Sequence, residues 1–237
     1  MPSFFITGTD TDAGKTALSA LLLAGLRQRG YLALPMKPAQ TGCENNIPDL
    51  DYALAMSGIE ADAGLRKKMA PACYSPACSP HLAAEMEDRP LSLEELVAAY
   101  HTLHAETDGV LVEGAGGVLV PLNRQETMLD LMSALQLPIL IAARPGLGTI
   151  NHTLLTIQTL QAHQLEVRGF IFVHTTSDGS DFTEPDNAKT IAAFSQVPWL
   201  GTIPYTPALA QVTPPCFNAL PDEIQTTTQQ LIDKIIP

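Results

Sequence analysis

Short apolar runs alternate along the chain with longer segments in which apolar residues recur every three or four positions. The short runs are typical of buried strands and the longer segments of amphipathic helices. The pattern predicts strands at residues 3–7, 31–37, 109–112, 138–143, 169–173 and 199–203. It predicts helices at residues 15–29, 91–106, 148–163 and 222–236.

Several of these predicted strands are apolar at every position, as in ILIAA and FIFV. Parallel strands that are covered by helices on both faces have this pattern. Their alternation with helices predicts an α/β fold: a doubly wound, mainly parallel β-sheet flanked by helices, in three α/β/α layers. No break requires a second domain, so residues 1–237 are expected to form one. Residues 174–187 and 206–218 are polar or proline-containing and are expected to be irregular.

The composition limits the partners. Thirteen Lys and Arg residues stand against 25 Asp and Glu residues, giving a formal net charge of −12. An acidic chain repels phosphate backbones and anionic lipid, so no nucleic acid or membrane partner is expected. No apolar run reaches the roughly 20 residues of a spanning helix, and the first residues lack secretory-signal features. We expect a cytoplasmic protein with reduced thiols at Cys43, Cys73, Cys78 and Cys216.

The most specific motif is GTDTDAGKT, residues 8–16, which follows a predicted strand and opens a predicted helix. This is the context of a phosphate-binding loop, where backbone N–H groups and the helix dipole face phosphate oxygens. Lys15 would reach the terminal phosphates, and the Thr16 hydroxyl would bind Mg²⁺. Five residues separate Gly8 from Gly14 where the common pattern has four, so a chance Gly-Lys-Thr is the alternative.

Magnesium requires oxygen ligands, and carboxylates follow two of the predicted strands. Glu113 ends the strand at residues 109–112. Ligands of parallel sheets bind at the carboxyl ends of strands, which would bring Glu113 beside the phosphate loop if the two strands are neighbours. A glutamate that caps a loop is the alternative. Asp49 and Asp51 follow the second strand, and taken alone each is interpreted as a helix N-cap.

Two further segments could stabilise anions. Lys37 ends the second strand in KPAQTG, residues 37–42, where it could stabilise a transferring negative charge; a solvated surface lysine is the alternative. RPGLGTINHT, residues 144–153, follows another strand and opens a helix. Its glycines free backbone N–H groups for a second anion such as a carboxylate. His152, on the first turn of this helix, is given no role.

The motifs GTDTDAGKT and KPAQTG resemble those of the dethiobiotin synthetases. Three further segments share this resemblance: SPHLAAE (residues 79–85), VEGAGG (residues 112–117) and LPILIAARPGLGTINHTLLT (residues 137–156). The longer phosphate loop also fits that family. The resemblance implies a P-loop NTPase fold and a homodimer that forms the ureido ring of dethiobiotin. The substrates would be 7,8-diaminononanoate, carbon dioxide and ATP, with Mg²⁺ as cofactor. A carbamate of the diamine would be phosphorylated to a carbamic-phosphoric anhydride, and the second amine would close the ring.

The resemblance also implies roles for individual residues. The catalytic residues would be Lys15, Lys37 and Thr11. The substrate would be bound by Thr11, Lys37 and Thr41, and by Leu147, Gly148, Thr149 and Asn151 of the other subunit. Mg²⁺ would be held by Thr16, Glu113 and Asp51, with Asp51 favoured over Asp49. The nucleotide would be bound by Asp12, Ala13, Gly14, Lys15, Thr16, Ala17, Asp51, Glu113, Gly114, Ala115, Gly116, Val173, His174, Pro204, Tyr205, Thr206 and Gln211.

The sequence leaves the nucleotide and two other functions open. The family usually has an Asn that reads the adenine where this chain has Val173 and then His174, so ATP, CTP and GTP are all candidates. The alternative functions are a nucleotide-switch ATPase of the partitioning type and a P-loop small-molecule kinase. The switch ATPase would require a basic face or tail, whereas the C-terminal helix has one lysine, Lys234.

Overall fold

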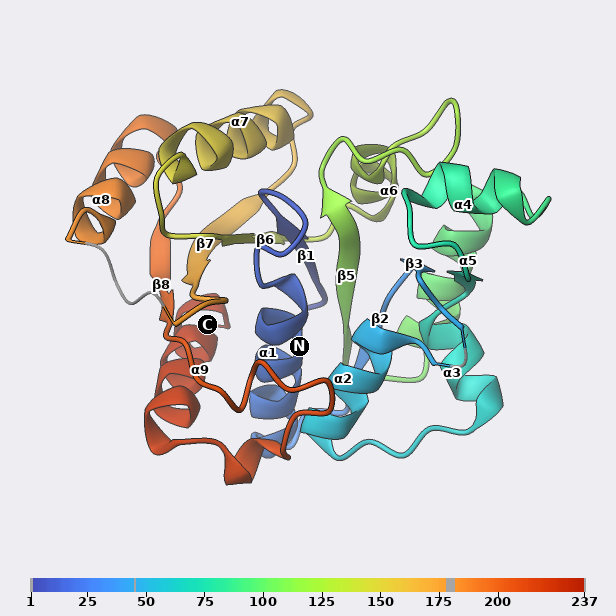
Figure 1. The fold of residues 1–237 in the computed structure, drawn as a ribbon, viewed down its shortest axis with the longest axis horizontal. Coiled ribbons are helices and arrows are strands. Elements are labelled where there is room, and N and C mark those ends of the chain that lie inside the picture. Colours follow the sequence, from blue (N-terminus) through green and yellow to red (C-terminus); the bar gives the residue numbers. More distant parts are fainter. Residues whose placement is uncertain (1, 45, 178–181, 237) are drawn as a thin grey trace.

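The computed structural model describes residues 2–44, 46–177 and 182–236. Its centre is a six-stranded sheet in the order β2-β5-β1-β6-β7-β8 (Figure 1), in which every neighbouring pair is parallel. The strands are β1 (Phe4–Gly8), β2 (Ala33–Met36), β5 (Gly109–Gly117), β6 (Ile139–Ala143), β7 (Val167–Val173) and β8 (Trp199–Ile203). The parallel sheet that the sequence predicted is confirmed.

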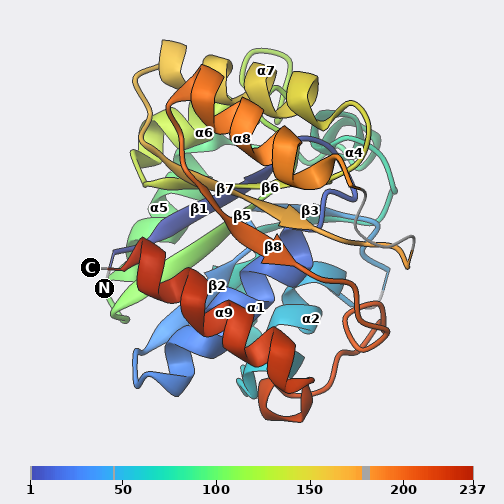
Figure 2. The same ribbon diagram turned by 90° about the vertical axis from the view of Figure 1, so that its left-hand side faces the viewer.

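Helices cover both faces of this sheet, as Figure 2 shows. One face carries α1 (Lys15–Gln28) and α9 (Asp222–Ile235), with α2 (Pro48–Ser57) beside α1. The other carries α5 (Leu93–His104), α6 (Met128–Leu135), α7 (Thr149–Ala162) and α8 (Glu184–Ser195). In the fully buried β6, alternate residues enter the two apolar cores, Ile141 one and Leu140 the other. The predicted α/β/α layering is therefore confirmed.

A smaller layer near β2 was missing from the sequence prediction. Two three-residue strands, β3 (Ala39–Thr41) and β4 (Ala72–Tyr74), pair in parallel. The short helices α3 (Ala63–Met69) and α4 (Pro80–Met86) complete this part of the chain. These elements position the segment that follows Lys37.

The irregular segments agree only in part with the prediction. The loop expected at residues 174–187 is wrong at its end, because α8 begins at Glu184; residues 178–181 lie outside the described residues. Residues 206–216 consist of turns and coil, followed by a short 3-10 helix at Phe217–Ala219. No helix in the described part of the chain is long and apolar enough to cross a membrane.

The sheet topology brings the motif-bearing strand ends together. β1 lies between β5 and β6, with Ile6 opposite Glu113 in the first ladder and Gly8 opposite Ala142 in the second. Because the strands are parallel, the loop after β1, Lys37 after β2 and the end of β5 share one edge of the sheet. The neighbourhood expected for Glu113 is confirmed.

Candidate functional site

The loop between β1 and α1 is built to approach an anion closely. Gly14 immediately precedes α1 and is left-handed (φ 87°), a conformation that favours glycine. A Cβ on Gly14 would lie 2.4 Å from Cγ1 of Val173, so the loop packs directly on the end of β7. No side chain caps the start of α1, and its first N–H groups can face a phosphate.

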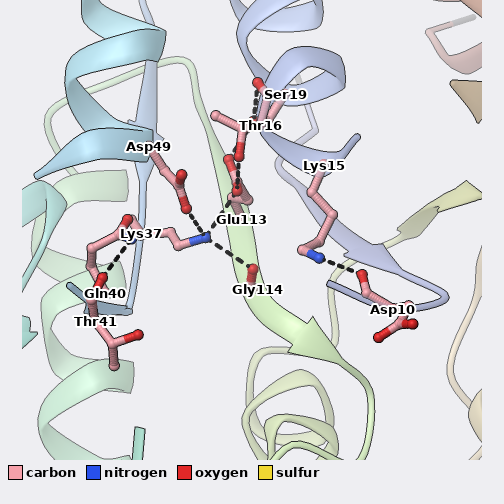
Figure 3. A network of polar contacts seen from close by, with 10 residues as sticks. All are labelled: Asp10, Lys15, Thr16, Ser19, Lys37, Gln40, Thr41, Asp49, Glu113 and Gly114. Atoms are coloured by element: carbon pink, nitrogen blue, oxygen red, sulfur yellow. Dashed lines mark hydrogen bonds and ion pairs between the residues drawn. The ribbon is translucent and has the colours of Figure 1, made fainter. Parts of the chain in front are cut away.

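Lys15 is buried in this loop. Its ammonium donates a hydrogen bond to the backbone oxygen of Asp10 (2.8 Å; Figure 3). Burial, and after it repulsion by Lys37, lower the pKa of Lys15. An anion bound beside Lys15 would favour the charged form again, which suits this lysine to phosphate oxygens.

Lys37 is the centre of a buried ion cluster (Figure 3). Its Nζ lies 2.5 Å from Oδ2 of Asp49, 2.9 Å from Oε1 of Glu113 and 3.2 Å from the backbone oxygen of Gly114. Burial by itself would lower the pKa of Lys37, but attraction by Glu113 and Asp49 outweighs it and raises that pKa. With 5% of the residue exposed, Lys37 is not the solvated surface lysine of the alternative interpretation.

Two hydroxyls on α1 orient Glu113. Thr16 Oγ1 donates to Oε1 (2.8 Å) and Ser19 Oγ donates to Oε2 (2.6 Å), as Figure 3 shows. Burial by itself would raise the pKa of Asp49, but attraction by Lys37 outweighs it and lowers that pKa. Glu113 therefore belongs to this cluster and does not serve as a loop cap.

This donor set fits magnesium. The Thr16 hydroxyl and the carboxylates of Asp49 and Glu113 are hard oxygen ligands, which this ion prefers. The described residues contain no group of three or more His, Cys, Asp or Glu that could hold a metal by themselves. A magnesium ion here would complete its coordination with nucleotide phosphates and water, as it commonly does.

The structure places the two aspartates of α2 in different surroundings. Asp51, favoured from the resemblance, accepts a hydrogen bond from the Ile47 N–H (2.9 Å) and is paired with Arg66. Positions two apart on a helix point in nearly opposite directions, so α2 can direct only one of the pair to Lys37. The aspartate in the cluster is Asp49, and Asp51 lies outside it.

The phosphate loop and the ion cluster line one cleft of about 1020 Å³. Ala13 is buried within the loop, and Gly114 contributes its backbone oxygen to Lys37. Gln40 and Ser79, from the KPAQTG and SPHLAAE motifs, lie on the same wall. The sequence-predicted residues that line the cleft are Thr11, Asp12, Gly14, Lys15, Thr16, Ala17, Lys37, Thr41, Glu113, Ala115 and Gly116.

Sequence reasoning missed part of the cleft wall, namely Tyr52, Thr175, Leu209 and Val212. The neighbouring residues that it named instead, Pro204, Tyr205, Thr206 and Gln211, are not lining residues. Val173 is buried against Gly14. His174 Nε2 pairs with Oε2 of Glu184 (3.0 Å). Neither Val173 nor His174 lines the cleft, whereas Thr175 does.

Comparison with known proteins identifies the family. A family model described as an AAA domain matches residues 2–213. The ATP-dependent dethiobiotin synthetase BioD of Anaeromyxobacter dehalogenans (strain 2CP-C) is 37% identical over 227 residues, which are 95% of this chain and 100% of that protein. The protein of the same name from Bacillus subtilis (strain 168) is 35% identical over 213 residues, 90% of each chain. The chain belongs to the dethiobiotin synthetase family.

Solved structures show that this synthetase shares its fold with other nucleotide-binding proteins. The cell division ATPase MinD of Pyrococcus furiosus has a TM-score of 0.64 at 18% identity. The superposition covers 99% of this chain and 98% of the MinD chain. The septum site-determining protein MinD of Pyrococcus horikoshii OT3, complexed with Mg-ADP, also has a TM-score of 0.64, at 17% identity, with coverage of 100% and 96%. At these identities the likeness establishes the fold alone.

The residues that were predicted to bind the substrate from the other subunit line a different cleft. Leu147, Gly148, Thr149 and Asn151 line a hollow of about 820 Å³ at the start of α7, together with residues at the start of α8. Gly148 is left-handed (φ 93°), and no side chain caps the helix. Leu147 is fully exposed. Within one chain, these residues do not share the cleft that holds Lys37.

Proposed function

We propose that this chain forms dethiobiotin from 7,8-diaminononanoate, carbon dioxide and ATP, as a Mg²⁺-dependent cyclo-ligase of biotin biosynthesis in the cytoplasm. The observation that carries the proposal is the pair of buried lysines in one cleft. Lys15 lies in the phosphate loop, and Lys37 is held charged between Asp49 and Glu113. The cleft thus offers positive charge to two anions, a nucleotide triphosphate and a carbamate.

The chemistry needs such an arrangement. The 7-amino nitrogen attacks carbon dioxide and loses a proton, which gives a carbamate. A carbamate oxygen then attacks the γ-phosphorus and ADP leaves. This phosphorylation is needed because a carbamate is a poor electrophile until its oxygen becomes part of a phosphate leaving group. The 8-amino nitrogen attacks the carbamate carbon and loses a proton, phosphate departs with the electron pair of the broken C–O bond, and the ring closes.

We assign parts in this reaction to seven residues of the cleft. Lys15 and Lys37 stabilise the negative charge that spreads over the transferring phosphoryl group and the carbamate. The hydroxyls of Thr11 and Thr41, both on the wall, hold the diamine or carbamate in line by hydrogen bonds. Asp49, Glu113 and Thr16 would hold Mg²⁺, which when bound neutralises phosphate charge.

The proposal includes a homodimer. The start of α7 has the uncapped N–H groups that suit the substrate carboxylate, but it does not share the cleft of Lys37 in its own chain. A second subunit could supply it. Exposed apolar residues next to this hollow, Leu147, Leu155 and Phe182, favour burial against another copy.

The decisive experiment is fixation of labelled bicarbonate. The purified protein is given the diamine, Mg²⁺ and either ATP, GTP or CTP. We expect label in an acid-stable cyclic urea, with one phosphate released per turnover. A phosphorylated diamine without ring closure would indicate a kinase. Nucleotide hydrolysis with no fixed label in any tube would contradict the proposal and favour a nucleotide switch.

A further inference from the structure

Residues 206–212, here called the wall loop, form part of the cleft through Leu209 and Val212. Val212 is 89% exposed although it is apolar, so it presents carbon surface to the cleft and not to the core. The backbone bonds of this loop are internal: the Leu209 N–H donates to Thr206 O (3.0 Å), and the Ala210 N–H donates to Pro207 O (3.2 Å). The loop has a locally determined shape. Its position depends on the packing of Ala208 and Leu209 on the apolar core and on one polar attachment to another element.

Tyr52 provides that attachment. Its hydroxyl donates a hydrogen bond to the backbone oxygen of Leu209 (2.8 Å). Within the described parts of the chain, this is the hydrogen bond that connects the wall loop with another element. Burial raises the pKa of Tyr52 to about 12, so the hydroxyl keeps its proton and remains a donor at neutral pH.

The same helix carries a charged group of the site. Tyr52 follows Asp49 by three residues on α2, and side chains at that spacing project from one face of a helix. Asp49 contacts Lys37 while Tyr52 contacts the wall loop, and both line the cleft. Through α2, the apolar wall is fixed relative to the ion cluster.

We propose that Tyr52 is a positioning residue for the nucleotide: it holds the wall loop so that Leu209 and Val212 pack on the face of the base. The inference rests on the proposed function, in which the phosphates occupy the loop after β1 and the base lies further along the same cleft. Apolar side chains contact the flat face of any base and do not read its edge. The contribution of Tyr52 is therefore equal for ATP, GTP and CTP.

The test is Tyr52→Phe, which removes the hydroxyl and keeps the ring. We expect the KM for each nucleotide to rise roughly 3- to 10-fold, the equivalent of one hydrogen bond, by the same factor for all three. The kcat and the KM for the diamine stay unchanged, because Lys37 still holds Asp49. Fixation of labelled bicarbonate at varied nucleotide concentration gives these constants.

Two further variants separate positioning from stability. Val212→Ser removes apolar surface from a side chain that is already exposed, so the fold is retained and the nucleotide KM rises. Tyr74→Phe is the matched control: its hydroxyl also donates to a backbone oxygen, that of Arg89 (3.1 Å), but Tyr74 does not line the cleft. This control should leave every KM unchanged.

An unchanged nucleotide KM in Tyr52→Phe or in Val212→Ser overturns the inference. A rise for only one nucleotide overturns it as well, because it would indicate recognition of the base edge. If the unmodified chain fixes no label, the proposed function fails instead. Titration calorimetry with ATP then still tests Tyr52, since the expected loss is in nucleotide affinity.

Discussion

At the scale of the residue, we expect the same substitution, aspartate to asparagine, to affect activity very differently at the two aspartates of α2. Asp49→Asn removes a carboxylate that contacts Lys37, and we expect kcat/KM to fall on the order of 100-fold. Asp51→Asn is the matched control. It removes a half-exposed pair with Arg66, worth about 0.2–1 kcal/mol of stability, and should leave the activity within about twofold of the unmodified chain. Equal losses in both variants, measured by label fixation, would contradict the assignment of Asp49.

The thiols provide a second prediction at this scale, one that depends on pH. Burial, and after it the neighbouring Cys73, raise the pKa of Cys43 to about 12. At pH 8 roughly one in 10⁴ of these thiols is then ionised. We expect iodoacetamide to modify the exposed Cys216 well before Cys43, with the Cys43 rate rising about tenfold per pH unit. Mass spectrometry of the alkylated peptides measures this, and rapid modification of Cys43 at pH 8 would refute it.

The same shift in pKa affects stability in a defined direction. A thiol whose pKa is raised on folding binds its proton more tightly in the folded state. The stabilisation from Cys43 is therefore fully present below the ordinary thiol pKa of 9.0 and is lost as the pH rises through about 12. Comparison of thermal melts at pH 8 and pH 11 for Cys43→Ala and the unmodified chain isolates this contribution.

At the scale of the element, the phosphate loop depends on one glycine. In Gly14→Ala the new Cβ meets Val173 at 2.4 Å in a left-handed backbone, so both a clash and backbone strain arise. We expect a loss of about 1–3 kcal/mol of stability and loss of the rise in Tm on addition of ATP. Gly30→Ala is the control, because Gly30 has a similar φ (88°) but open space around it. It should be destabilised by strain alone and keep its response to ATP; the same behaviour in Gly14→Ala would contradict this account.

The elements also show how far the sequence could predict this molecule. Apolar runs such as β6 were predictable because burial on both faces determines their composition. The three-residue strands β3 and β4 were not, since they are too short to have a period. The motifs favoured Asp51 over Asp49, but the packing of α2 decides which of them reaches Lys37, and that packing cannot be read from the residue types. At the end of β7, Val173 and His174 were predicted to bind the nucleotide, whereas Thr175, two residues after Val173, lines the cleft.

At the scale of the whole molecule, neither cleft of a single chain contains all the groups that the proposed reaction needs. One holds Lys37 and the phosphate loop, and the other holds the uncapped start of α7. In a two-fold dimer, each active site would take Lys37 from one subunit and Asn151 from the other. Each subunit would then contribute to two sites, and this arrangement has a consequence that a monomeric enzyme cannot reproduce.

That consequence is complementation between two inactive variants. Lys37→Ala removes the buried charge, and Asn151→Asp brings a carboxylate to the expected position of the substrate carboxylate, so each variant alone should be inactive. In a heterodimer of the two, one site carries both lesions and the other carries neither. With random assembly half of the dimers are mixed, and about a quarter of the sites are intact. We expect co-expressed chains to recover about a quarter of the activity per site.

Lys37→Ala paired with Asp49→Asn is the control: both lesions affect the same cleft, so no site is restored. If the first pair recovers no more activity than the control, Asn151 acts in its own subunit or not at all.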